Sequence, residues 1–219
     1  MRTGRVTIGA RQVRCTRMLG AALVLVCGLA TLPSDATACG NDVFPVESPE
    51  LSTLKVAKNA LATGRYELAR KLIRGSFRDI EKAVPGANDT QTGALRVMAV
   101  AVARSGGRVS PRTADAKMTV EENLEWAVAA LRRINEHRKN EPWRQTDLAE
   151  ALAKLPKHQV EARKVLEELD ARDVVATAEG YATLAMLRGE GGDTKGHDAA
   201  IARCKKMTQK PAICQSGRS

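Results

Sequence analysis

The chain has 219 residues, of which 35 are basic and 25 acidic, and its formal net charge is +10. A basic chain can bind nucleic acid through its phosphates, but only 3% of these residues are aromatic and so able to stack on bases. The composition therefore argues against a nucleic-acid partner. It fits better with an auxiliary attraction to anionic lipid headgroups or acidic polymers.

The first 38 residues have the layout of a secretory signal. Five arginines precede the apolar run from Met18 to Leu32, which at 15 residues is shorter than the roughly 20 needed to span a bilayer as a helix. An A-x-A pattern ending at Ala38 follows, so we predict that residues 1–38 are removed and that the protein is exported. An arginine-rich organelle transit peptide is the competing interpretation. Cleavage would leave 181 residues with a net charge of +6, and no second apolar run of spanning length.

Three cysteines remain after the predicted cleavage: Cys39, Cys204 and Cys214. An odd number in an oxidising compartment suggests one disulfide and one cysteine with another role. We expect Cys204 to pair with Cys214, although Cys204 could also be a buried thiol. The stretch 36–39 (ATAC) resembles the lipobox of bacterial lipoproteins, which would make Cys39 an acylated membrane tether. Ala36 stands where that motif usually has leucine, so an unmodified Cys39 is the alternative.

Residues 48–207 show apolar side chains at helical spacing and almost no two-residue alternation, which predicts an all-α domain. The residues Ser-Pro-Glu at 48–50 open the first helix, because a capping hydroxyl, a first-turn proline and an acid favour a helix start. This helix is expected to end at Gly64. The second begins near Tyr66 and ends by the Pro-Gly pair at 85–86.

The third expected helix covers residues 92–105 and should be buried on most sides, because it is apolar on more than one face. Its segment 95–103 (LRVMAVAVA) could alternatively be a strand. After a long loop, residues 119–122 (TVEE) form a capping box that opens a fourth helix running to about Ile134.

Two further helix pairs follow along the chain. Residues 143–155 are expected to pair with 158–171 around a hinge at Pro156, and residues 173–188 with 196–207 across a glycine-rich turn. The sequence thus predicts four helical hairpins in succession.

The first hairpin resembles the tetratricopeptide repeat, a pair of helices of about 34 residues with small side chains where they cross. The match places small residues at the crossing and a glycine and an aromatic at the hinge: Ala57, Gly64, Tyr66 and Ala69, followed by Ile73 and Ser76. Downstream, Ala127 and Ala162 keep part of the pattern, but the hinge glycine is missing. The repeat's usual tryptophan, leucine-glycine pair and closing proline are missing or displaced throughout.

This resemblance implies an α-solenoid of about four degenerate repeats over residues 50–208, with a linker at 39–49 and a tail at 209–219. Stacked hairpins of this kind offer a groove for a peptide or another protein. The predicted disulfide would fold the tail over the last helix and cover its exposed end. An irregular helical bundle is the alternative.

Catalytic and cofactor motifs are scarce. His137, His158 and His197 are scattered, and no C-x-x-C or H-x-x-x-H pair suggests a metal site. The glycine-rich stretch 189–196 lacks the Ser or Thr that a phosphate-binding loop carries after its lysine, here Lys195. We therefore expect no cofactor and no enzymatic activity.

Four residues are candidates for partner binding. Trp126 lies off the apolar stripe of its helix, so it either packs on the adjacent repeat or anchors a ligand in the groove. The loop 105–119 carries Arg108, Arg112 and Lys117 and is either a tolerated insertion or a contact surface.

The leading hypothesis is a non-enzymatic scaffold of the cell envelope that binds another envelope protein or peptide, in a bacterial periplasm or attached to the outer membrane. The alternative is an enzyme acting on cell-wall glycan, or its accessory subunit. In that case a single general acid would be needed, and Glu150 or Glu179 would supply it.

Overall fold

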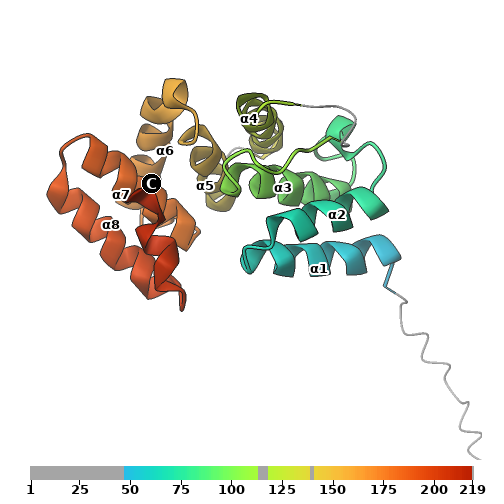
Figure 1. Cartoon of the computed structure of the whole chain (residues 1–219), viewed down its shortest axis with the longest axis horizontal. Helices are drawn as coiled ribbons and strands as arrows, with labels where there is room; N and C mark the ends of the chain where they lie inside the picture. Colours follow the sequence, from blue (N-terminus) through green and yellow to red (C-terminus); the bar gives the residue numbers. More distant parts are fainter. Residues whose placement is uncertain (1–46, 113–117, 139–140, 219) are drawn as a thin grey trace, which may run out of the picture. The chain divides into compact units, whose positions relative to one another are not determined.

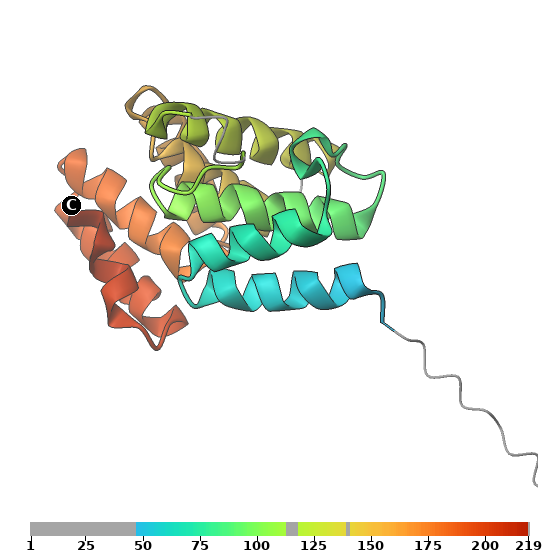
Figure 2. The same ribbon diagram turned by 45° about the vertical axis from the view of Figure 1, so that its right-hand side comes forward.

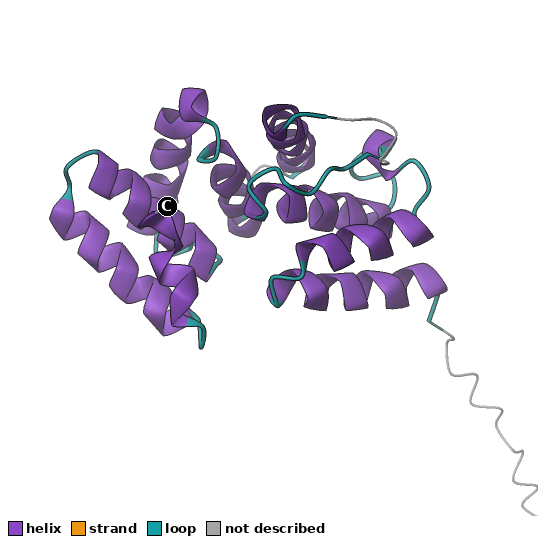
Figure 3. Ribbon diagram, in the orientation of Figure 1, coloured by secondary structure: helices purple, strands orange, loops and turns teal. Residues whose placement is uncertain are grey.

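Eight α-helices and three short 3-10 helices make up the part of the chain that the computed structural model describes, residues 47–112, 118–138 and 141–218 (Figures 1 and 3). These residues belong to one unit spanning residues 45–219. The predicted signal segment, Cys39 and Lys117 lie outside the described residues. The elements are α1 (Pro49–Ala62), α2 (Tyr66–Ser76), η1 (Ile80–Lys82), α3 (Asp89–Arg104), α4 (Val120–His137), α5 (Pro142–Leu152), η2 (Pro156–His158), α6 (Gln159–Ala171), α7 (Ala178–Glu190), α8 (Thr194–Met207) and η3 (Pro211–Arg218).

The all-α prediction is confirmed for the described residues, none of which forms a strand (Figure 3). The alternative of a strand at 95–103 is wrong, because this segment lies inside α3. Its apolar residues are buried on nearly every side of the helix, as the unusually apolar sequence predicted. Surrounding helices rather than neighbouring strands provide that burial, so the segment needs no sheet partner.

Four helix pairs follow one another along the chain. α1 packs against α2, α3 against α4, α5 against α6 and α7 against α8, as the sequence predicted (Figure 1). Each odd-numbered helix also contacts the next odd-numbered one, so α1, α3, α5 and α7 form one continuous series of contacts. Figure 2 shows α1, α2 and α3 side by side at the beginning of this series.

Two helix boundaries depend on residues outside the regular helix. α2 ends at Ser76, within the limit predicted from the Pro-Gly pair, because Phe77 is extended and Asp79 adopts a left-handed backbone with φ of 49°. That turn buries the side chains of Phe77 and Ile80. α7 begins only after Thr177, whose hydroxyl accepts a hydrogen bond from the Gly180 amide and so caps the helix start.

The predicted helix starts at α1 and α4 are confirmed in detail. Ser48 accepts a hydrogen bond from the Leu51 amide. Thr119 and Glu122 form the reciprocal capping box, in which each side chain accepts from the other residue's backbone amide. These bonds satisfy amides that have no partner inside the helix, so the local sequence alone fixes where both helices begin.

Fully buried alanines mark the contacts between helices. Ala57 in α1 and Ala69 in α2 have no exposed surface, and the same holds for Ala127 in α4 and Ala162 in α6. Small side chains let helix axes approach closely. Gly64, between α1 and α2, has φ of 78°, a left-handed conformation that glycine adopts without strain.

A disulfide between Cys204 and Cys214 links the chain's last segment to α8, as predicted. Both cysteines are buried. The bridge places η3 against α8 and, more extensively, against α7, whereas the sequence predicted a cover over the last helix alone. Among the described residues, no helix is both long and apolar enough to cross a membrane.

Candidate functional site

A cavity of about 480 Å³ lies where the join between α1 and α2 meets the C-terminal ends of α3 and α5, one face of α7 and the C-terminal tail. We call it the Arg104 pocket. Its walls come from the beginning, middle and end of the described chain, and the residues that matter below are Tyr66, Arg104, Arg108, Glu150, Lys154, Glu179, Met186, Lys210 and Ile213. The volume is within the usual range of ligand pockets, roughly 300 to 1,000 Å³.

Arg104 connects three odd-numbered helices at the bottom of this pocket. Its Nε and Nη2 donate to Oε2 and Oε1 of Glu150 in α5, at 2.8 and 3.1 Å, and its Nη1 donates to Oε1 of Glu179 in α7 at 2.9 Å. The Thr177 hydroxyl also donates to Oε1 of Glu150, at 2.5 Å. One guanidinium therefore holds α3, α5 and α7 together, and its bidentate geometry fixes their relative positions.

The electrostatics of the pocket follow from this cluster. Burial lowers the pKa of Arg104, but the charge and hydrogen bonds of Glu150, aided by Glu179, outweigh it and raise that pKa above its ordinary value. Arg104 is therefore permanently charged. Burial also raises the pKa of Tyr66, with Arg104 opposing the change. The Tyr66 phenol is thus neutral and can act as a hydrogen-bond donor at the pocket wall.

A second charged cluster joins α3 to α5 farther from the pocket. Arg96 Nε donates to Oδ2 of Asp147 at 2.5 Å, and the Arg96 and Arg144 guanidinium groups lie 4.6 and 4.7 Å from the ring centre of Trp143. Burial raises the pKa of Asp147 to about 6, despite the opposing effect of Arg96. Its other oxygen, Oδ1, is buried without a hydrogen-bond partner among the described residues. Only one oxygen of this carboxylate therefore accepts a described hydrogen bond.

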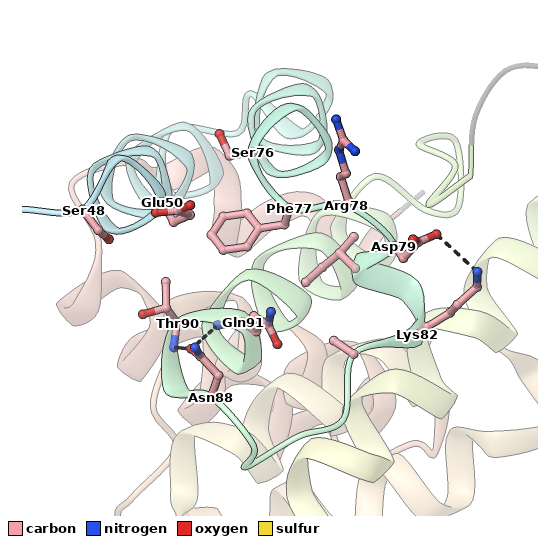
Figure 4. Close-up of a pocket in the computed structure, with 12 residues that line it drawn as sticks. Ser48, Glu50, Ser76, Phe77, Arg78, Asp79, Lys82, Asn88, Thr90 and Gln91 are labelled. Carbon is pink, nitrogen blue, oxygen red and sulfur yellow. Dashed lines mark hydrogen bonds and ion pairs between the residues drawn. The ribbon is translucent and has the colours of Figure 1, made fainter.

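A larger cavity of about 590 Å³ lies at the other end of α1, where the end of α2 and the start of α3 meet it. Figure 4 shows Phe77 pointing into the space between these helices, with Ser48 and Asn88 nearby. Ser48 and Asn88 use their side-chain oxygens to cap α1 and α3, and Lys82 pairs with Asp79 at 3.2 Å (Figure 4). These polar groups already serve the fold, so this cavity is a weaker candidate site than the Arg104 pocket.

The structure separates the binding residues suggested by the sequence. Arg108 lines the Arg104 pocket, whereas Arg112 and Trp126 line a different cavity of about 400 Å³ beside η1. Trp126 is partly buried and packs against the hydrophobic core. Lys117 lies outside the described residues. The loop therefore does not present its described arginines as one surface.

The first part of this loop is held by its own contacts. The Ser105 hydroxyl accepts from the Val109 amide, and Asn123 Nδ2 donates to the Gly107 carbonyl at 2.9 Å. Arg74 of α2 donates to the Pro111 carbonyl. Residues 105–111 thus connect α2, α3 and α4, and a partner-binding role of this loop stays a prediction.

Arg104 was not predicted from the sequence, which suggested Glu150 and Glu179 only as general-acid candidates. A signal was nevertheless present, because Asp147 and Glu150 lie one turn apart in a helix that is otherwise mostly apolar or small. Charged residues at such positions are almost never buried unless paired. Asp147 is 1% exposed and Glu150 3% exposed. Their partners lie in other helices, some 46 to 51 residues away in sequence.

The described residues bring together no metal-binding group. The three histidines lie on separate elements, and no set of three or more His, Cys, Asp or Glu side chains among these residues could hold a metal ion. Comparison with protein-family models, with curated proteins and with solved structures gave no match for this chain.

Proposed function

We propose that this chain is a non-enzymatic scaffold that binds another protein or peptide through the layer of odd-numbered helices, with the Arg104 pocket as the main contact. The observation that carries the proposal is the convergence of α3, α5, α7, the α1–α2 join and the tail on one cavity. A site assembled from successive helix pairs suits an extended partner, because each pair contributes separate side chains along the same surface.

The finer architecture in this proposal is a tetratricopeptide-like solenoid of four degenerate repeats. The series of contacts from α1 through α3 and α5 to α7 supports it, because stacked hairpins repeat the same neighbour relations along the chain. η3 continues the series by packing on α7. In this reading the tail covers the apolar end of the last repeat, a protection that terminal repeats generally need.

We further propose that the protein is exported, to a bacterial periplasm or to a site attached to the outer membrane through Cys39. The signal-like layout of residues 1–38 supports export. The bond between Cys204 and Cys214 supports it independently, because structural disulfides persist mainly in oxidising compartments. No nucleic acid, metal or organic cofactor is part of the proposal.

The contacts of the two glutamates favour binding over glycan hydrolysis. Both oxygens of Glu150 accept hydrogen bonds, three in all, from Arg104 and Thr177. A general acid must instead present a proton to its substrate. Glu179 also shares its Oε1 with Arg104. Both carboxylates thus have the surroundings of acceptors that hold helices in place.

Site-specific photo-crosslinking tests this proposal. A photoreactive phenylalanine analogue would replace Met186, which lines the pocket, or Val160, which is 85% exposed on α6 and lines none of the described cavities. The full chain is expressed and exported by a bacterial host, irradiated and purified. We expect a discrete crosslinked partner from position 186 and none from position 160. Equal crosslinking from both positions, or from neither, would refute the proposed binding face.

A cell-wall digestion assay tests the enzymatic alternative with the same protein. The proposal predicts no digestion above that of a buffer control. Digestion that disappears on changing Glu179→Gln, while the variant keeps its melting temperature, would replace the binding function with catalysis.

A further inference from the structure

We infer that the Arg104 pocket selects an acidic segment of the partner, one in which carboxylates lie next to aliphatic side chains. This inference rests on the proposed binding function and specifies the chemistry of the partner. The evidence for it is the charge distribution around the pocket. The acidic groups there are ion-paired with Arg104, whereas several basic groups have no described carboxylate partner.

The two acidic side chains of the pocket both accept hydrogen bonds from one arginine. Both carboxylate oxygens of Glu150 accept from Arg104, and one oxygen of Glu179 does. Their side chains are only 4% and 27% exposed, whereas that of Arg104 is 12% exposed. Together these three groups carry one net negative charge, and of the two carboxylates Glu150 is buried while Glu179 is partly exposed.

Three further cations surround the same cavity: Arg108, Lys154 and Lys210. All three are exposed. No described carboxylate lies within ion-pair distance of any of them, although Lys210 Nζ does donate weakly to the Ala62 carbonyl at 3.4 Å. Counting all six groups, the pocket has a net charge of +2. A partner segment with carboxylates would complement this charge, whereas a basic segment would be repelled.

The apolar part of the pocket defines the second requirement. Met186 of α7 and Ile213 of the tail line it, together with small side chains such as Ala182. Met adapts its shape to different aliphatic groups. A purely acidic segment would leave this surface uncovered, so acidic residues next to Leu, Ile or Val suit the pocket better than acidic residues alone.

Fluorescence anisotropy with synthetic peptides tests the inference. The probe is a fluorescein-labelled hexapeptide of alternating Glu and Leu, amidated so that its terminal carboxylate is absent, and the comparison peptide has Lys in place of Glu. We expect saturable binding of the Glu peptide that weakens with added salt, and at least tenfold weaker binding of the Lys peptide. Equal binding of both peptides, or tighter binding of the Lys peptide, would overturn the inference.

A matched pair of variants separates the pocket from the overall charge of the protein. Lys154→Glu reverses a charge at the pocket, and Lys71→Glu makes the same change on the exposed surface of α2, away from the described cavities. We expect about tenfold weaker binding of the Glu peptide for Lys154→Glu and less than a twofold change for Lys71→Glu. Equal losses would mean non-local attraction and would overturn the assignment.

Arg108→Glu repeats the test at another cation that lines the pocket should Lys154→Glu fail to fold. Circular dichroism verifies the fold of every variant. The outcome is separable from that of the crosslinking experiment. A partner crosslinked at position 186 together with no binding of the Glu peptide would preserve the binding function and refute only its acidic specificity.

Discussion

Replacing Arg104 with methionine should destabilise the fold far more than removal of a surface arginine. The change deletes both guanidinium bonds to Glu150 and the bond to Glu179. Glu150 is 3% exposed and would retain one described hydrogen bond, that from the Thr177 hydroxyl. The variant therefore leaves a buried charge without its counter-ion, which is the expensive outcome when one partner of a buried ion pair is removed.

The expected cost is about 3 to 5 kcal/mol in the free energy of unfolding, the range for breaking a buried pair. For a domain of this size, each kcal/mol lowers the melting temperature by roughly 2 to 4 °C, so the total decrease is roughly 6 to 20 °C. The Glu179 bond adds little to this value, because its carboxylate is partly exposed and regains water. Most of the cost therefore comes from Glu150.

Chemical denaturation and thermal melting measure this effect, and two further variants identify its cause. Arg70→Met removes an arginine whose partner Glu67 is 51% exposed, so it should leave stability nearly unchanged. The double variant Arg104→Met with Glu150→Met replaces the charges by apolar groups and should recover most of the loss. A single Arg104→Met variant as stable as Arg70→Met, or a double variant no more stable than the single one, would refute the account of a buried, mutually neutralised pair.

Three other perturbations have definite expected outcomes. Changing Cys204 and Cys214 to Ser should cost about 3 kcal/mol, from a crosslink spanning 10 residues, and should increase amide exchange in the tail and at the α1–α2 join but not in α4. An increase in amide exchange that is confined to the tail would contradict this coupling between the tail and the α1–α2 join. Because burial raises the pKa of Asp147 from 3.8 to about 6, the folded state holds a proton that the unfolded state has lost, and stability should fall by roughly 3 kcal/mol as the pH rises between these values. In the Asp147→Asn variant, denaturation curves recorded from pH 4 to 7 should not show this loss of stability. An unchanged dependence of the free energy of unfolding on pH would contradict the prediction. Ala69→Phe should overpack the contact between α1 and α2 and cost about 1 to 3 kcal/mol, whereas Leu68→Phe at an exposed site should not, and equal melting temperatures would disprove the tight contact.

The helix pairs were predictable because their signals are local. Capping residues, glycines and apolar periodicity each act within one or two turns, so Ser48 and the Thr119 capping box located two helix starts correctly. The exact helix ends were less predictable. The Pro-Gly pair only limits the end of α2, which stops at Ser76, one residue after Gly75, where Phe77 and Ile80 turn into the core.

The candidate site was much less predictable, for a physical reason. Its central interaction joins residues of α3, α5 and α7 that lie 46 and 75 positions apart in sequence. Periodicity shows which face of a helix is apolar, but it does not show which buried arginine will meet which buried glutamate. The disulfide was the exception, because cysteines pair with one another and the choice of partners was small.

The tail is the element through which the disulfide and the pocket depend on one another. Lys210 and Ile213 line the pocket, and both lie inside the loop that the bond between Cys204 and Cys214 closes. Lys210 also donates to the Ala62 carbonyl at the end of α1, 148 residues earlier in the chain. The tail also packs on α7 and α8, so the disulfide acts together with these contacts to hold one pocket wall in place. Opening the bond should therefore loosen this wall, and with it two of the groups that we assign to partner recognition.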